Sequence, residues 1–528
     1  MNSYSKNIAL LFLLSYTNWS IAQQLNLPLN REFNLTNQKA FNAFDANIHT
    51  SFQPILQAQI SIDSSSILSK NEQNDFLMNT KKTYLENRSW FARMLFYENF
   101  IQVDTGKFYL TIDPLLNLEL GEDIEDKRPD KPTLFVNTRG IIAKGHIGKK
   151  FSFQTAVYEN QATLPNYMVD YVDAHNVVPG QGRVKKFKDN GLDYNTATSY
   201  ISYSPNKRLN FQLGNDKQFI GDGYRSLLLS DFANNYPYYK AVVLFGKKNQ
   251  FQYTKLNAGL SNLNRREDGS TPEALFTRKS MSVHYLSWIA TKWLHLGIFE
   301  STIWQTESQS GTKPYNFMQL NPILFLNTLN AGFDGNDNSQ LGINTKIKFP
   351  FKTIIYGQLM YDGNEINTKY GYQAGIKYFG ISGLTLQAEF NKVEPYTFSS
   401  ELPLQNYSHF NEPLAHPLGA NFTEIVGIVN YKYKRIFTQA KATVAQTTST
   451  GSNIFINYYY TTNEITPIVE TEIINLQFHI GVLVNPKNNM SIMLGINNRT
   501  ITTNNIDFNT NYVYFAFRTS LRNLYSDF

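Results

Sequence analysis

From about residue 108 onward, apolar and polar residues alternate along most of the chain. Residues 384–391 (LTLQAEFN) place two Leu, one Ala and one Phe on one face and Thr, Gln, Glu and Asn on the other, and residues 341–349 and 473–484 repeat the pattern. A period of two residues is that of a β-strand. The alternating segments run about 8 to 12 residues, the length that a tilted membrane-spanning strand needs. The pattern predicts an all-β membrane protein.

The connections between these segments are of two kinds. Short polar turns, such as 205–207 (PNK), 247–249 (KKN) and 485–489 (NPKNN), alternate with long irregular stretches such as 216–238 and 394–422. Outer-membrane β-barrels sort their connections in this way, with short turns in the periplasm and long loops outside, whereas a soluble β-sandwich has no physical reason to do so. Counting strands from this alternation predicts a closed antiparallel barrel of about 18 strands over residues 106–528, with both ends in the periplasm.

The first residues have the order of a secretory signal. Lys6 precedes an apolar run at 8–14 (IALLFLL), and Ser20-Ile21-Ala22 supplies small residues just before Gln23. The run is too short for a membrane anchor, which needs roughly 20 apolar residues. We therefore expect a signal peptide at 1–22, cleaved near Ala22, and export to the outer membrane.

Residues 23–105 precede the alternating region. Within them, residues 68–96 carry Leu77, Leu85 and Phe91 near helical spacing, with charged residues between. A hydrophobic stripe of this kind packs against a neighbour more often than it binds a cofactor. We expect an N-terminal periplasmic or plug segment at 23–105 with a helix at about 68–96.

The composition agrees with a barrel and excludes several chemistries. Mean hydropathy is −0.35, as for a soluble protein, but in a barrel only alternate residues face lipid. The chain has no Cys, which excludes disulfides, thiolate metal sites and Cys nucleophiles. Its formal net charge of +6 is too mild, and too evenly spread, to indicate nucleic acid as a partner.

No catalytic motif is apparent in the sequence. The eight His form no HExxH pair, there is no GxSxG, and Gly221–Ser226 (GDGYRS) lacks the GKS/T ending of a phosphate loop. The acidic pairs at 122–123 and 125–126 lie in a charged run that is typical of a solvated loop. We predict no enzyme activity, no metal and no cofactor.

Two of the long connections are too apolar to lie in water. Residues 216–240 carry three consecutive Leu, and residues 315–329 read YNFMQLNPILFLNTL. We expect both to fold into the lumen. Their polar and aromatic groups could bind sugar, or the loops could simply plug the pore, and the sequence leaves both open. The candidate binding residues of the inward loops are Asp222, Arg225, Asp231, Tyr236, Tyr239, His409, His416 and Asn421.

The same loops carry a resemblance to a known family. Residues 219–231 (FIGDGYRSLLLSD) and 413–422 (PLAHPLGANF) resemble a signature of Bacteroidetes outer-membrane proteins related to the Wzi capsule-assembly family. Residues 24–33 (QLNLPLNREF), 112–115 (IDPL) and 518–528 (RTSLRNLYSDF) resemble the RemB-type gliding-motility proteins. The resemblance implies an 18-stranded barrel closed by helices and inward loops, with a role in attaching capsular polysaccharide or in surface gliding.

Two function classes follow. The first is a non-enzymatic outer-membrane barrel for gliding motility or surface polysaccharide attachment, with membrane lipid, polysaccharide and other surface machinery as partners. The alternative is an outer-membrane pore or transporter for solutes or an exported polymer. Apolar inward loops favour the first class, and conductance separates the two.

Overall fold

The structure is a computed structural model that describes residues 25–56, 88–188, 190–265, 276–308, 311–312, 317–331, 337–363, 369–456, 468–519 and 522–528. The predicted signal peptide and residues 68–87 of the predicted helix lie outside the described residues, so both stay predictions. In the described part of that range, residues 88–89 are not helical, and a separate short helix, α6 (Trp90–Phe96), begins after its N-cap Ser89. None of the helices in the described ranges is long and apolar enough to cross a membrane.

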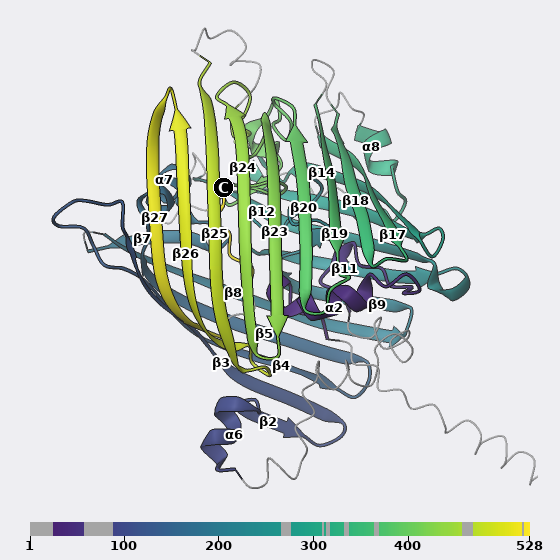
Figure 1. The fold of residues 1–528 in the computed structure, drawn as a ribbon. Coiled ribbons are helices and arrows are strands. Elements are labelled where there is room, and N and C mark those ends of the chain that lie inside the picture. Colours follow the sequence, from purple (N-terminus) through teal and green to yellow (C-terminus); the bar gives the residue numbers. More distant parts are fainter. Residues whose placement is uncertain are drawn as a thin grey trace, which may run out of the picture.

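Within the described residues, eighteen antiparallel strands close into one barrel, as the alternation predicts (Figure 1). Each strand pairs with the next along the chain, and short turns at one end alternate with longer connections at the other, except that the turn 504–505 between β26 and β27 is also short. The strands are β3 (Phe108–Asp123), β4 (Leu134–Ile147), β5 (Phe151–Thr163), β8 (Gly191–Asn206), β9 (Leu209–Asp216), β11 (Tyr236–Phe245), β12 (Phe251–Arg265), β13 (Phe276–Ile289), β14 (Leu294–Gln305), β17 (Asn338–Phe349), β18 (Thr353–Asp362), β19 (Tyr370–Tyr378), β20 (Leu384–Val393), β23 (Phe422–Tyr433), β24 (Ile436–Thr448), β25 (Glu470–Asn485), β26 (Met490–Thr503) and β27 (Ile506–Arg518).

Smaller elements lie in the lumen, in the connections and, for α8 and β2, against barrel strands. The helices are α2 (Arg31–Phe41), α7 (Asn166–His175), α8 (Leu326–Ala331), η1 (Lys247–Asn249), η2 (Phe317–Leu320) and η3 (Pro403–Gln405). The short strands are β1 (Phe52–Gln53), β2 (Ile101–Asp104), β6 (Val177–Val178), β7 (Gly182–Phe187), β10 (Phe219–Ile220), β15 (Glu307–Ser308), β16 (Gly311–Thr312), β21 (Ser408–His409) and β22 (Glu412–Pro413).

The closing junction between the first and last barrel strands is assembled from three pieces. β27 pairs with β3 only over residues 512–518. Below it, the Thr519 hydroxyl accepts from the Leu116 N–H (2.8 Å) and donates to the Pro114 carbonyl (2.9 Å). β2 then pairs with residues 109–112 of β3, and Asp113 accepts hydrogen bonds from the two residues before β2 (2.6 and 2.9 Å). These contacts satisfy an edge that a membrane protein cannot leave bare.

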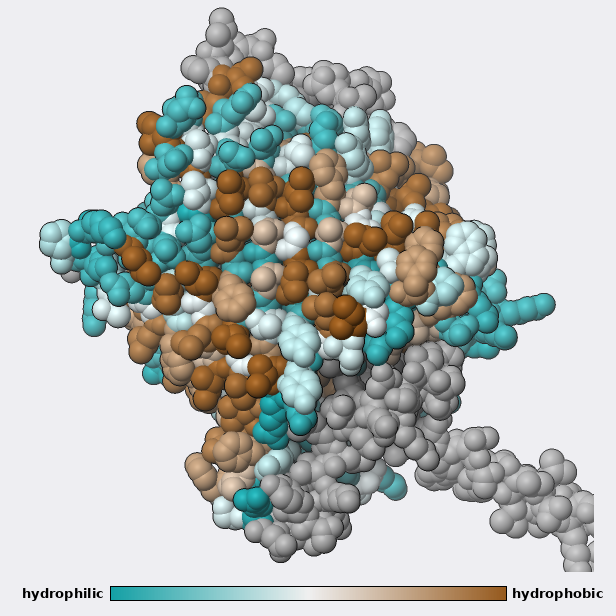
Figure 2. Space-filling view, viewed as in Figure 1, coloured by the Kyte–Doolittle hydropathy of each residue, from teal (hydrophilic) through white to brown (hydrophobic). Residues whose placement is uncertain are grey.

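On the face shown in Figure 2, exposed apolar side chains form a band across the outer wall. Leu213, Ile201 and Leu120 are among the most exposed, and their strand neighbours point inward and are polar or buried. This is the outward-apolar, inward-mixed arrangement of membrane barrels.

Four parts of the chain fill the lumen. They are the N-terminal residues 25–56, the loop 216–235, the loop 394–421 and the last residues 522–528, which we call the tail. β1 of the first part pairs with β10 of the second. The three Leu at 227–229 and Phe232 are fully buried, which confirms the inward fold expected for that loop. The tail was expected to end in the periplasm, but it turns into the lumen, where Figure 1 marks the C-terminus near the barrel centre.

The second apolar connection does not fold inward, and that prediction was wrong. Its described part, residues 317–331, packs against the outer wall of the barrel, and Figure 1 shows α8 at the barrel flank. Its polar residues Asn327 and Thr328 are buried against the wall, whereas Phe317 and Leu329 are 78% and 77% exposed. The prediction weighed two surroundings for this connection, water and the lumen. A membrane barrel offers a third place, against the outer face of its wall.

Candidate functional site

Arg225 is the centre of a buried charge cluster in the lumen. Its guanidinium donates to Glu424 on β23 (Nη2 to Oε1, 2.8 Å) and pairs with Asp527 of the tail (Nη1 to Oδ1, 3.3 Å). Lys441 on β24 reaches the other oxygen of Asp527 at 2.7 Å. Burial alone raises the pKa of the Asp527 carboxyl, but Arg225 and Lys441 outweigh it and hold that pKa below its usual range. The cluster therefore fixes the inward loop and the tail to the barrel wall.

The two predicted aspartates tie other parts of the plug together. Asp222 accepts from Lys346 Nζ on β17 (2.9 Å) and from the Thr50 hydroxyl (2.7 Å). Lys346 and Thr50 together lower the pKa of the Asp222 carboxyl against the opposing effect of burial. Asp231 accepts from the Asn523 amide (2.7 Å) in the tail. Both carboxylates are satisfied within the chain.

His409 and His416 are buried and neutral. His409 Nδ1 accepts from the Ser261 N–H and Nε2 donates to the Asn235 carbonyl, both at 3.1 Å. Burial lowers the pKa of His409 to about 3. His416 Nε2 donates to Glu424 at 2.7 Å, while burial lowers the pKa of His416 despite that carboxylate.

The remaining predicted residues lie apart from one another. Tyr236 faces the lumen with its ring edge-on to His409, at 5.8 Å between centroids. Tyr239 lies on the outer face of β11 and is 38% exposed. Asn421 is in a left-handed conformation (φ 49°) and donates to the Thr450 carbonyl at 2.6 Å. The structure thus brings most of the predicted residues together as a plug, and Tyr239 stands on the opposite face of the wall.

A pocket opens at the long-loop end, above the tail. It has a volume of about 690 Å³ and lies between α7, the loop 403–419 and the loop 447–455. None of the eight predicted residues lines it. Its walls carry aromatic rings and amides: Tyr167, Tyr171, His175, Phe455, Phe528, Asn262, Asn264, Asn406, Asn411, Asn453 and Arg499. We call it the outer pocket.

The aromatic wall of the outer pocket is a continuous row of ring contacts, stacked between Tyr171 and His175 and tilted or edge-on elsewhere. Tyr171 lies between His175 (ring centroids 4.1 Å) and Phe528 (4.7 Å). Phe455 meets His175 edge-on at 5.9 Å. The Tyr171 hydroxyl is buried without a hydrogen-bond partner in the described part of the chain, and burial raises its pKa well above the usual value. An unpaired buried hydroxyl is available to a ligand that brings its own hydroxyl.

The polar side of the outer pocket is held in place by hydrogen bonds. The Asn411 amide donates to the His175 carbonyl (3.2 Å) and the Asn406 amide donates to the Ile454 carbonyl (3.1 Å). Arg499, on β26, lies 4.6 Å from the ring centre of Tyr167 and donates to the Phe528 carbonyl at 2.5 Å. Fixed amides, a guanidinium and flat rings suit a hydroxyl-rich ligand.

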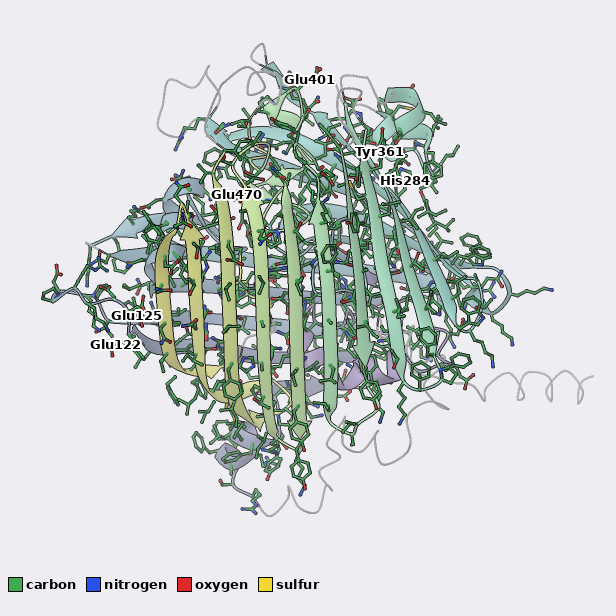
Figure 3. All side chains as sticks on the ribbon, turned by 45° about the horizontal axis from the view of Figure 1, so that its top comes forward. Glu122, Glu125, His284, Tyr361, Glu401 and Glu470 are labelled. Carbon is green, nitrogen blue, oxygen red and sulfur yellow. The ribbon has the colours of Figure 1, made fainter. Side chains whose placement is uncertain are left out.

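Two glutamates lie at the long-loop end, outside the lining of the outer pocket. Figure 3 shows Glu401 and Glu470 at the end of the barrel formed by the long loops, and His284 and Tyr361 farther along the same side of the view. Among the described residues, no group of three His, Asp or Glu is placed to hold a metal ion.

A second cavity of about 1310 Å³ opens at the short-turn end, beneath the plug. It is lined by α2 and by the short turns, with Lys432, Lys434 and Lys487 among its cations. The Arg225 cluster and the packed Leu residues of the 216–235 loop lie in the lumen between the two openings.

The sequence interpretation missed the outer pocket. The connection at 160–197 carries an aromatic ring at every fourth position: Tyr167, Tyr171 and His175. That spacing predicts three rings on one helix face and could have identified α7. The sequence analysis predicts that the chain ends in the periplasm, so nothing in it indicates the place of Phe528 under the pocket.

Comparison with known proteins bears on the fold. No family model matches the chain, and no curated protein matches it. Among solved structures, the chain is similar to Wzi of Escherichia coli, described as an outer-membrane protein involved in group 1 capsule assembly and a carbohydrate-binding β-barrel (13% identity, 94% of this chain and 100% of Wzi covered, TM-score 0.56). It also aligns with OprD of Pseudomonas aeruginosa (10% identity, 77% and 94% covered, TM-score 0.44). At these identities the likeness to Wzi shows a shared fold, that of an outer-membrane β-barrel.

Proposed function

We propose that this chain is a non-enzymatic outer-membrane barrel that holds a surface polysaccharide in the outer pocket. The observation that carries the proposal is the outer pocket itself, a cavity of ligand-binding size with an aromatic wall and a polar wall of amides, open at the long-loop end. The similarity of the fold to Wzi, a carbohydrate-binding β-barrel, supports the proposal.

The pocket binds a sugar chain by two kinds of contact. The C–H face of a sugar ring packs against the partly exposed ring of Phe455, and the sugar hydroxyls exchange hydrogen bonds with the Asn411 and Asn453 amides. The buried Tyr171 hydroxyl and Arg499 supply further partners at the floor of the pocket. Because the lumen beneath the outer pocket is filled, a sugar chain held in the pocket stays at the surface.

The alternative, a pore for solutes or an exported polymer, has less support. The lumen between the two cavities holds a fully buried Arg225, three buried Leu and the tail. Planar-bilayer recording separates the two functions: a surface-binding barrel stays closed at moderate voltage, and stable open channels would favour the pore.

The cellular role we propose is surface gliding or capsule attachment, after export through a cleaved signal at 1–22. These two roles share one scaffold, and fold does not decide between them. A deletion strain tested for spreading and stained for capsule separates them. Lost spreading with a normal capsule favours gliding, and the reverse favours capsule attachment.

The direct test is binding of oligosaccharides from the surface polysaccharide of the source bacterium to purified protein, measured by calorimetry. We expect Tyr171→Ala to weaken binding, because it removes the ring at the centre of the row. Tyr239→Ala is the matched control, since it removes a Tyr ring from the outer face of the wall. Equal binding by both variants and the unmodified protein would exclude the outer pocket as the site.

A further inference from the structure

Three ionisable side chains lie next to one another on the outer wall of the barrel. Lys255 on β12 pairs with His284 on β13, which pairs with Glu300 on β14. Their immediate neighbours Leu256, Val283 and Phe299 point into the lumen core, so these three side chains point outward. All three are nonetheless buried, at 7%, 0% and 0% exposure. We call them the wall cluster.

The wall cluster is internally connected. Lys255 Nζ lies 2.6 Å from His284 Nε2, and the Tyr253 hydroxyl lies 2.8 Å from His284 Nδ1. Lys255 also bonds the hydroxyl of Ser282, which points outward from the same strand as His284. The cluster is a polar patch about three strands wide on a surface that elsewhere carries apolar side chains.

Residues 317–331, which we call the strap, cover the wall cluster. Glu300 accepts from the Phe325 N–H (2.6 Å), the Thr328 N–H (2.9 Å) and the Thr328 hydroxyl (2.8 Å). The Asn327 amide lies 3.3 Å from His284 Nε2. The Tyr253 hydroxyl donates to the carbonyl of Pro322 at 2.6 Å. The strap is thus held to the wall by the wall cluster itself.

The strap has the reverse polarity of a soluble surface segment. Its polar residues Gln319, Asn327 and Thr328 are buried against the barrel. Its exposed large side chains are apolar: Phe317, Leu320, Ile323, Phe325 and Leu329. Pro322 and Asn330 are the other exposed positions, and Asn330 is the polar one. In water this arrangement would leave several large apolar side chains solvated together, which soluble surfaces avoid.

The wall cluster also lies at membrane depth. The stacked aromatic pair Phe251 and Trp288, of which Trp288 is exposed, lies at the short-turn end, four residues from Lys255 and from His284 respectively. At about 3.3 Å per residue and a tilt near 40°, four residues rise about 10 Å, well inside an apolar band about 25 Å tall. A bare Lys on the lipid face at this depth is strongly unfavourable.

We propose that the strap is embedded in the bilayer, with lipid acyl chains as the partner of its apolar face. It contacts lipid through Phe317, Ile323 and Leu329 and shields the wall cluster, so that the barrel keeps an apolar surface where its own strands do not provide one. The strap, residues 317–331, is therefore a membrane element and not a surface loop.

The chain has no Cys, so single Cys residues report position without further changes. We would label L329C and I323C with a nitroxide in protein reconstituted into vesicles, and measure accessibility to oxygen and to a water-soluble nickel chelate. L359C on the bare wall (51% exposed in the native protein) is the lipid control, and I456C in an outer loop (44%) is the water control.

We expect the strap labels to behave like the label at 359, with high oxygen and low nickel accessibility. Strap labels that match the label at 456 would overturn the proposal. Heat-modifiability of each variant on gels confirms that the barrel is closed before the comparison is made.

A second measurement does not depend on the label. Vesicles containing brominated lipid should quench a Trp placed by Leu329→Trp more than one placed by Ile456→Trp, each relative to the unmodified protein. Equal quenching of the two would contradict an embedded strap.

Discussion

Two connections of this barrel carry similar apolar runs and end on opposite sides of its wall. The loop 216–235 places Leu227, Leu228 and Leu229 in the lumen core, fully buried. The strap places Phe317 and Leu329 on the outside and buries its amides instead. Each connection packs against the wall with the side chains that match the polarity of the wall surface there.

The difference shows that the polarity of the wall surface determines which side chains of a connection pack against it. Behind the first loop, β13 and β14 present Val283, Tyr285 and Phe299 to the lumen, and apolar side chains pack on them. On the other side, the same strands present His284 and Glu300, which need hydrogen-bond donors and acceptors. A buried charge without partners is costly, so each connection supplies what its side of the wall lacks.

The largest expected effect is at the centre of the plug. Arg225→Ala leaves Glu424 and Asp527 buried without their common cation, which costs about 3–5 kcal/mol. We expect the tail and the loop to leave the wall and channel openings to appear in planar bilayers. The strap should stay in place, because its contacts are on the other face of the wall. A variant as closed and as stable as the unmodified protein would show that the cluster does not hold the plug.

A matched pair of substitutions compares the two connections directly. Leu228→Ala opens a cavity in the lumen core and should lower the free energy of unfolding by about 2–5 kcal/mol. Leu329→Ala removes the same atoms from an exposed position and should lower it far less. Urea titrations of reconstituted protein measure both, and equal losses would contradict the assignment of the two faces.

Acidification should loosen the plug. The folded-state pKa of His409 is about 3, below its ordinary value of 6.5, so the neutral form is favoured in the folded state. The stability that this provides is complete above pH 6.5 and is lost as pH falls toward 3, at about 1.4 kcal/mol per pH unit. The urea midpoint should therefore fall from pH 7 to pH 5. His409→Asn should reduce that fall, and an unchanged pH dependence in this variant would assign it to other groups.

The smallest effect is expected at the strap. Asn327→Ala removes the amide beside His284 and should cost about 1 kcal/mol. Limited proteolysis of intact vesicles should then cut within 317–331 faster, while planar-bilayer recordings stay closed. Faster cutting together with channel opening would mean that strap and plug are coupled through the wall.

The barrel could be predicted from the sequence because its signals are local. The period of two residues and the alternation of short and long connections fix the strands, and the Leu run at 227–229 predicted an inward loop correctly. The strap had the same apolar signal, and that signal does not distinguish lumen from lipid. The missing information lay on other strands: Lys255, His284 and Glu300 occupy outward positions of membrane strands, which predicts a cover over them.

The candidate site was predicted only in part. The motif around Arg225 was correctly placed in the lumen, but its partner Asp527 is 302 residues away and no periodicity links the two. The outer pocket is assembled from three connections, the strands β12, β24 and β26, and the tail, so its composition depends on the closed barrel. Only the Tyr167–Tyr171–His175 spacing was visible beforehand.

The path of the tail has a mechanical consequence. Residues 522–528 continue directly from β27, and within the lumen they are bound by Arg225, Lys441 and Arg499. A force that pulls residue 528 out through the short-turn end must break these contacts before it reaches the junction of β27 with β3. The tail acts as a latch in series with that junction, so the strands that close the cylinder are the last to carry the load.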